Sequence, residues 1–244
     1  MEYEATVRHI KYLEERYGVS VRRLKSEGIE EVCKRVGVPF LSKHISMMIG
    51  RLQRKGFKWE DESYEVLRER YKGCESALKW WCDVWGGRFG ISYRKGLKEF
   101  LMKYPPTFKI SEKCCEYVKI KPKEKYEKEV GCDVSVCGVR KSEGGARSTA
   151  YKDEGGMRRP LFFWKDEDKK RYCEERWIVH SDCYTVYGMK RTGCGGCPLS
   201  RELWKDLEVL KEYEGELYEK CMRVFGEVYE YRRMYEEFKR NKSQ

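Results

Sequence analysis

Four cysteines stand in two tight pairs, and this pattern constrains the 244-residue chain more than any other feature. Cys114 and Cys115 are adjacent, and Cys194 and Cys197 belong to a Cys-Gly-Gly-Cys-Pro motif. Thiolates are common metal ligands, so one centre held by both pairs requires a fold that brings two distant segments together. The glycines and the proline favour such a site, because they let the backbone fold tightly and free amide groups to bond sulfur.

A zinc ion and a 4Fe-4S cluster do not fit this cysteine pattern equally well. A tetrahedral zinc ion needs sulfurs roughly 3.8 Å apart. Adjacent helical side chains, about 100° apart around the axis, reach that spacing poorly. A 4Fe-4S cluster offers separate iron corners and suits a divergent pair better. The sequence therefore favours a 4Fe-4S cluster on these four cysteines, with zinc as the alternative metal and four buried, unliganded thiols as the simplest alternative.

The composition indicates a reduced, cytoplasmic protein. Twelve cysteines are spread along a long chain rich in Lys and Glu, which does not resemble a small secreted disulfide scaffold. The chain has no run of about 18 apolar residues, and the opening Met1-Glu2-Tyr3-Glu4 lacks a signal-peptide pattern. We therefore expect no membrane partner. The net charge of +11 favours nucleotides, phosphate or nucleic acid as ligands without choosing among them.

Apolar spacing predicts an α/β fold with a helical insertion and C-terminal helices. Strands are predicted around 19–24 and 134–139, where Val and Leu recur at short intervals. Pro122 is predicted to kink or split the helix that carries Cys114 and Cys115. The predicted helices span 4–17, 28–36, several stretches between 43 and 104, 111–130, 165–177, and two or three stretches beyond Ser200.

A basic, glycine-rich loop follows the strand predicted at 134–139. Arginine offers a planar, permanently charged fork suited to phosphate or sulfate, and glycine lets backbone amides approach an anion closely. Ligands of open α/β sheets bind beyond the C-terminal ends of strands, which is where this loop falls. A solvated surface loop is the alternative. The predicted anion-binding residues are Arg140, Lys141, Glu143, Gly144, Gly145, Arg147 and, near the second cysteine pair, Arg191.

Three segments together resemble one known family. They are 113–122 (KCCEYVKIKP), 138–147 (GVRKSEGGAR) and 191–198 (RTGCGGCP). In this order and spacing they resemble the phosphoadenosine phosphosulfate (PAPS) reductase family, specifically its cluster-bearing adenylylsulfate reductase branch. The resemblance covers nearly the whole chain.

The resemblance implies an adenine nucleotide α-hydrolase-like, or Rossmann-like, sheet that is incomplete here. Cys114, Cys115, Cys194 and Cys197 would ligate a 4Fe-4S cluster, and Arg140 and Arg147 would face the phosphosulfate or phosphate of an adenylated ligand. The implied organisation is a partial α/β nucleotide-binding core at 1–42, a helical insertion at 43–106, the rest of the core with the cluster and anion-binding loops at 107–199, and a C-terminal helical segment at 200–244.

Two family elements are absent: the Ser-Gly-Gly-x-Asp-Ser phosphate loop (PP-loop) and the terminal Glu-Cys-Gly-Leu-His element. Either an upstream polypeptide supplies the PP-loop half, or the sequence is a fragment, or nucleotide turnover has been lost. The leading expectation is the C-terminal part of a split sulfonucleotide reductase or PP-loop enzyme, an oxidoreductase or sulfotransfer type with a thiol reductant as partner. The alternatives are a component of nucleic-acid thiolation or phosphorothioation and a non-catalytic, metal-stabilised binding module. The sequence identifies no catalytic residue.

Overall fold

Helices dominate the computed structural model, which describes residues 1–144, 147–148 and 156–242. Among the sequence predictions, Gly145 lies outside the described residues. The helices are α1 (Glu4–Tyr17), α2 (Ile29–Val36), α3 (Lys43–Arg54), α4 (Tyr64–Arg70), α5 (Glu75–Trp81), α6 (Leu97–Lys103), α7 (Lys121–Glu129), α8 (Asp166–Glu175), α9 (Asp182–Thr185), α10 (Leu203–Tyr213) and α11 (Gly215–Asn241).

The sheet is much smaller than the α/β prediction implies. Within the described residues it consists of β1 (Ser135–Val136) and β2 (Met157–Arg158), which pair in parallel. The strand predicted at 134–139 is thus confirmed only at its centre. The strand predicted at 19–24 is wrong: this stretch is irregular, and Val19, Val21 and Leu24 are exposed. No strand of the described chain lies beside it to bury these side chains, so their alternation has no structural effect.

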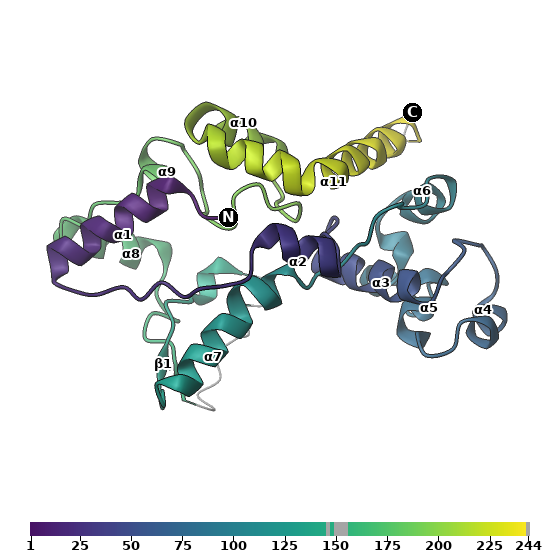
Figure 1. The fold of residues 1–244 in the computed structure, drawn as a ribbon, viewed down its shortest axis with the longest axis horizontal. Helices are drawn as coiled ribbons and strands as arrows, with labels where there is room; N and C mark the ends of the chain where they lie inside the picture. Colours follow the sequence, from purple (N-terminus) through teal and green to yellow (C-terminus); the bar gives the residue numbers. More distant parts are fainter. Residues whose placement is uncertain (145–146, 149–155, 243–244) are drawn as a thin grey trace.

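Figure 1 shows how the helices are arranged. Helices α3 to α6 form one end of the molecule, while α1, α8 and α9 lie at the other. The long α11 runs from the middle toward the α6 end and contacts both α2 and α6. Its Tyr231 and Tyr235 are buried against Phe40 and Phe100. This aromatic contact fixes the predicted helical insertion to the C-terminal helices.

The helix after Cys115 is divided where Pro122 predicts a break. A π-helical turn covers Glu116–Ile120, and α7 starts at Lys121. The Lys121 amide hydrogen-bonds to the Glu116 carbonyl, five residues back. Proline has no amide hydrogen, and its ring crowds the carbonyl four residues earlier, so the wider turn relieves both problems. The prediction for Pro122 is confirmed.

Segments far apart in sequence meet at the start of α1. Glu214, which separates α10 from α11, is 7% exposed. Its carboxylate accepts hydrogen bonds from the amides of Glu4 and Ala5, at 2.7 and 3.1 Å, and from the Tyr187 hydroxyl at 3.1 Å. The carboxylate therefore caps the N-terminus of α1 and ties it to the C-terminal helices.

Replacing this cap is expected to destabilise the fold. Glu214→Ala leaves buried donors without an acceptor, which should lower the free energy of unfolding by about 2–4 kcal/mol. Urea denaturation followed by circular dichroism measures the change. Glu216→Ala, an exposed glutamate in the first turn of α11, is the matched control and should change stability by less than about 0.5 kcal/mol. Equal stabilities for the two variants would contradict this role of Glu214.

Within the described residues, every helix is too short or too polar to span a lipid bilayer.

Candidate metal centre

The structure places the four predicted cysteine ligands in one region of the fold. Cys114 and Cys115 begin the helix that contains the π-helical turn, and Cys194 and Cys197 lie in the loop between α9 and α10. The thiols of Cys114 and Cys115 are hydrogen-bonded to each other, and Cys197 interacts electrostatically with Cys194 and Cys115. The two sequence pairs therefore form one group of neighbouring thiols, called the cysteine cluster below.

Two further buried thiols border the cysteine cluster. Cys33 on α2 interacts with Cys197 and Cys115, and Cys221 on α11 interacts with Cys194. Burial raises the pKa of both flanking thiols to about 12. Sequence analysis did not select either residue, because each occupies an apolar position of a helix and reads as core.

The protonation of the cysteine cluster is uneven. The hydrogen bond from Cys114 lowers the pKa of Cys115, against the effect of burial. The same hydrogen bond, followed by burial, raises the pKa of Cys114. Burial also raises the pKa of Cys197 to about 11. Since metals bind thiolates, loading this site has to release protons from the buried thiols.

Two lysines place positive charge beside these thiols. The Lys119 ammonium hydrogen-bonds to Cys194, one helical turn beyond Cys115. Loss of solvent lowers the pKa of Lys119, but the attraction of Cys194, Cys115 and Cys197 outweighs this effect and raises the pKa. Lys43, at the start of α3, also helps to lower the pKa of Cys115. These cations would offset the negative charge of a centre held by thiolates.

The Cys-Gly-Gly-Cys loop is fixed by close packing against α11. At Gly196, which has φ of 60°, an added Cβ would lie 2.6 Å from the Cys221 sulfur and 2.7 Å from the Tyr229 hydroxyl. The Tyr229 hydroxyl donates to the Gly196 carbonyl, and Arg232 donates to the Pro198 and Ser200 carbonyls at 2.9 Å each. Glycine is therefore required at 196 both for its conformation and for space.

The loop is also attached to the start of the chain. The Gly195 amide donates to the Met1 carbonyl at 3.1 Å, and the Cys197 amide donates to the Cys194 carbonyl at 3.2 Å. Such backbone contacts hold the two thiols of the motif in a fixed relative position. Helix α11, the chain start and the π-helical turn thus converge on one loop.

The cysteine cluster is not arranged as a metal site in this structure, because the described residues contain no group of three or more His, Cys, Asp or Glu side chains that could hold a metal ion. A single zinc ion requires four ligands within about 2.3 Å of one point. In a 4Fe-4S cluster, by contrast, each cysteine binds a different iron atom.

The predicted anion-binding loop has its own set of contacts, which do not involve the four cysteines. Arg140 donates to Asp166 at 2.8 Å and to the Lys165 carbonyl at 3.3 Å, while Arg147 pairs with Glu143. Burial opposes the charge of Glu143, but the Arg140 amide and the Arg147 guanidinium outweigh it and lower the pKa of this carboxyl. Lys141, Gly144 and Arg191 take no part in these pairings. Lys141 and Arg191 are exposed, and Gly144 is half-buried with φ of 69°.

A cavity of about 430 Å³ lies beside Arg140. Its lining includes Gly138, Trp164, Lys169 and Tyr172, and the two aromatic rings lie 5.3 Å apart. Small-molecule sites have volumes of about 300–1,000 Å³ and combine apolar walls with a few polar groups. The cavity thus offers aromatic surfaces and two cations next to the predicted anion-binding loop.

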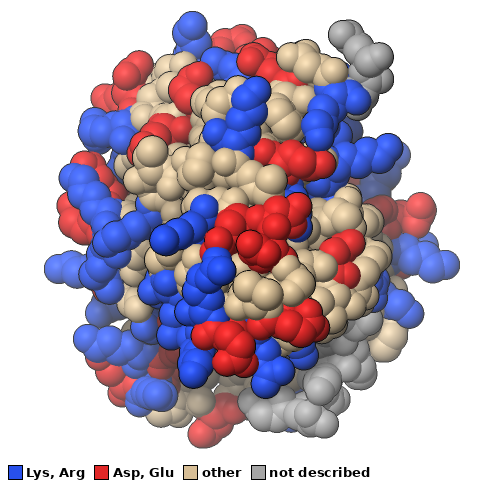
Figure 2. All heavy atoms as spheres, turned by 90° about the vertical axis from the view of Figure 1, so that its right-hand side faces the viewer, with Lys and Arg blue, Asp and Glu red and all other residues tan. Residues whose placement is uncertain are grey.

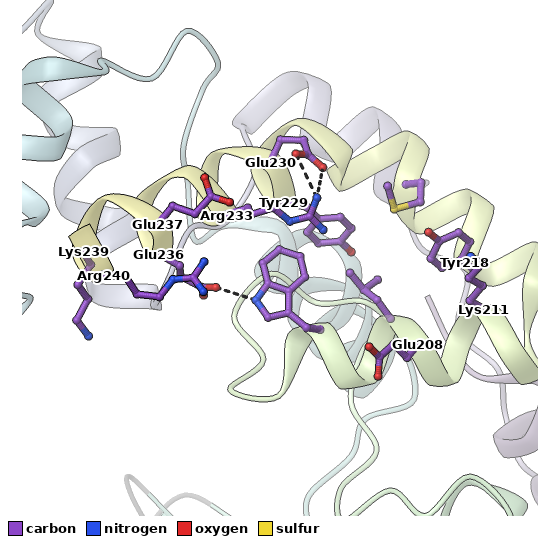
Figure 3. Close-up of a pocket in the computed structure, with 13 residues that line it drawn as sticks. Glu208, Lys211, Tyr218, Tyr229, Glu230, Arg233, Glu236, Glu237, Lys239 and Arg240 are labelled. Carbon is purple, nitrogen blue, oxygen red and sulfur yellow. Dashed lines mark hydrogen bonds and ion pairs between the residues drawn. The ribbon is translucent and has the colours of Figure 1, made fainter. Parts of the chain in front are cut away.

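A second cavity, of about 1020 Å³, is a groove between α10 and α11 (Figure 3). Trp204 donates to Glu236 across it at 2.8 Å, and Arg233 pairs with Glu230 along α11. Tyr229 lines the groove and also hydrogen-bonds to Gly196, so it separates the groove from the Cys-Gly-Gly-Cys loop. The groove carries charges of both signs and indicates no particular ligand.

Comparison with known proteins gives no match: no family model fits the chain, and none of the curated proteins or solved structures is significantly similar to it.

Proposed function

We propose that the protein is a PAPS reductase-like iron-sulfur protein, in which Cys114, Cys115, Cys194 and Cys197 hold a 4Fe-4S cluster near a site for an adenylated sulfate or phosphate nucleotide. The observation that carries the proposal is that the two cysteine pairs, far apart in sequence, lie near each other in the fold. Lys119 and Lys43 support it, because they place positive charge where a thiolate-ligated cluster is negative.

The proposed cluster belongs to an incomplete adenine nucleotide α-hydrolase-like fold. The parallel pair β1 and β2 and the parallel bridge between Val38 and Ile110 are compatible with the remainder of such a sheet. An upstream polypeptide would supply the PP-loop half. The cluster would contribute charge and redox chemistry near the nucleotide. The residues of this chain would bind and orient the nucleotide.

The cavity beside Arg140 is the proposed nucleotide site. Trp164 and Tyr172 offer aromatic surfaces on which an adenine ring can stack, and Lys169 and Arg140 offer positive charge to its phosphate or sulfate. Arg140 is held by Asp166 in this structure. An anionic ligand therefore has to compete with the Asp166 carboxylate for the guanidinium.

Because of this competition, substitutions of the two paired residues should change nucleotide affinity in opposite directions. Calorimetric titration of the full chain with adenosine 5′-phosphosulfate and with adenosine monophosphate measures the dissociation constant. Arg140→Ala should weaken binding about tenfold by removing a charge-assisted hydrogen bond. Asp166→Asn should strengthen binding severalfold, because it removes the competing carboxylate.

Arg171→Ala is the matched control, since this exposed arginine lies on the same helix as Tyr172 and outside the cavity lining. Its dissociation constant should equal that of the unmodified protein. The nucleotide site is wrong if Arg140→Ala and Arg171→Ala behave alike, or if neither nucleotide binds the unmodified chain.

A further inference from the structure

The segment joining α5 to α6 has an unusual composition. Residues 84–95 read VWGGRFGISYRK, with three aromatic residues, three cations and no Asp or Glu. The chain as a whole has 41 acidic residues, and basic residues elsewhere commonly alternate with them. This stretch, called the aromatic-basic segment, therefore differs from an ordinary solvated surface.

The aromatic rings of this segment face solvent. Trp85, Phe89 and Tyr93 are 45, 52 and 63% exposed. Two arginines accompany them: the guanidinium of Arg88 lies 4.8 Å from the Phe89 ring centroid, and that of Arg94 lies 6.0 Å from the Tyr93 ring centroid. Three large exposed rings within nine residues, with cations between and beside them, favour an interaction surface.

The three cations of the segment form no ion pair with the described residues, although Arg94 lines a cavity that Asp61, Asp83 and Glu99 also line. Among the described residues, no carboxylate lies within ion-pairing distance of Arg88, Arg94 or Lys95. Arg140, Arg147 and Lys98, by contrast, each pair with an acidic residue. Figure 2 shows the end of the molecule formed by α3 to α6, where many Lys and Arg side chains lie among Asp and Glu side chains. The segment thus offers three exposed cations that form no ion pair within the described part of the structure.

The backbone of the segment is held in place by contacts with Asp83 and with α11. Ile91 is buried, and the Ser92 hydroxyl donates to the Asp83 carboxylate at 2.5 Å. Gly90 packs so tightly on Asp83 that a Cβ would overlap its carboxylate. The Tyr235 hydroxyl of α11 donates to the Lys95 carbonyl at 3.1 Å. Rings on a fixed backbone lose little conformational entropy when they bind a partner.

We propose that the aromatic-basic segment binds single-stranded nucleic acid. Unpaired bases would stack on Trp85, Phe89 and Tyr93, while Arg88, Arg94 and Lys95 would contact phosphates. This combination of stacking surfaces and cations is the general basis of single-strand binding without sequence preference. A membrane surface fits less well, because glycine and serine interrupt the apolar residues. An acidic peptide would use the cations but would leave the three rings without a specific role.

Among the described residues, no hydrogen bond, ion pair or ring contact joins the aromatic-basic segment to the four cysteines. Binding can therefore be tested whether or not the protein carries a cluster. Fluorescence anisotropy of the full chain with a labelled oligodeoxythymidylate measures the dissociation constant. The triple variant Trp85→Ala, Phe89→Ala, Tyr93→Ala should weaken binding at least tenfold. Raising the salt concentration should weaken binding with a log–log slope of about −2, for three phosphate contacts.

Further variants separate the contribution of charge to binding from the contribution of base stacking. Arg88→Glu with Arg94→Glu should also weaken binding at least tenfold. Arg22→Glu with Arg23→Glu, in the exposed stretch before α2, makes the same change in net charge and should have a much smaller effect. Trp177→Ala, which removes a ring that is 82% exposed, is the control for the aromatic variant and should bind normally.

Three results would overturn the proposal. One is equal binding by the triple variant and Trp177→Ala. Another is equally tight binding of a duplex of the same length, because paired bases are not free to stack on the rings. The third is binding to polyglutamate or to phosphatidylserine vesicles that matches or exceeds binding to the oligonucleotide. Circular dichroism melting curves establish that the variants, all at exposed positions, remain folded.

Discussion

Cys197→Ser is expected to remove the iron-sulfur cluster, from about four irons and four sulfides per chain to less than about one. Cys114→Ser should have the same effect, because it removes a ligand from the other cysteine pair. A serine hydroxyl is a poor ligand for the iron of such a cluster, and both positions lie inside the same group of thiols. Iron and acid-labile sulfide analysis after anaerobic purification measures the loss.

Three other cysteines provide controls for this experiment. Cys132→Ser changes an exposed thiol outside the cysteine cluster and should leave the iron content unchanged. Cys33→Ser and Cys221→Ser change the flanking buried thiols and should also retain about four irons. Loss of iron in Cys33→Ser with retention in Cys114→Ser would show that the assignment of ligands is wrong.

Gly196→Ala is expected to disrupt the Cys-Gly-Gly-Cys loop. The added Cβ would lie well inside contact distance of Cys221 and Tyr229, and the residue would remain at positive φ. Overlap in a packed interior together with backbone strain should lower the free energy of unfolding by about 2–4 kcal/mol. Displacement of Cys194 and Cys197 should also reduce the bound iron. Urea denaturation and iron analysis measure the two effects.

The loop offers its own control for this substitution. Gly193 lies immediately before Cys194, has no neighbour within 4 Å of an added Cβ and does not have positive φ. Gly193→Ala should therefore change stability by less than about 0.5 kcal/mol and leave the iron content unchanged. If Gly196→Ala is as stable as Gly193→Ala, the close packing of Gly196 against α11 does not exist in solution.

Local patterns in the sequence predicted the helices well. The apolar spacing predicts a helix over 4–17, and α1 occupies this range and ends at Gly18, which is in the left-handed conformation. Pro122 predicts a break that appears as the π-helical turn. These features depend on neighbouring residues along the chain, so the sequence contains the information directly.

Non-local features were harder to predict. A strand requires a partner, and the alternating Val19 and Val21 resemble a strand although no strand of the described chain pairs with them. Similarly, Cys33 reads as a core residue until the fold places it beside Cys197. Lys119 could have been found, because it lies one helical turn beyond Cys115. The ion pair of Arg140 with Asp166 joins two different segments, so the residues around either one do not predict it.

The most direct test of the cysteine cluster is the metal content of the unmodified protein. Anaerobic purification of the full chain would be followed by analysis of iron, zinc and acid-labile sulfide, and by an absorption spectrum. The account predicts about four irons and four sulfides per chain, with a broad visible absorption that bleaches on reduction. One zinc ion without sulfide, or no metal at all, would contradict the proposed iron-sulfur centre.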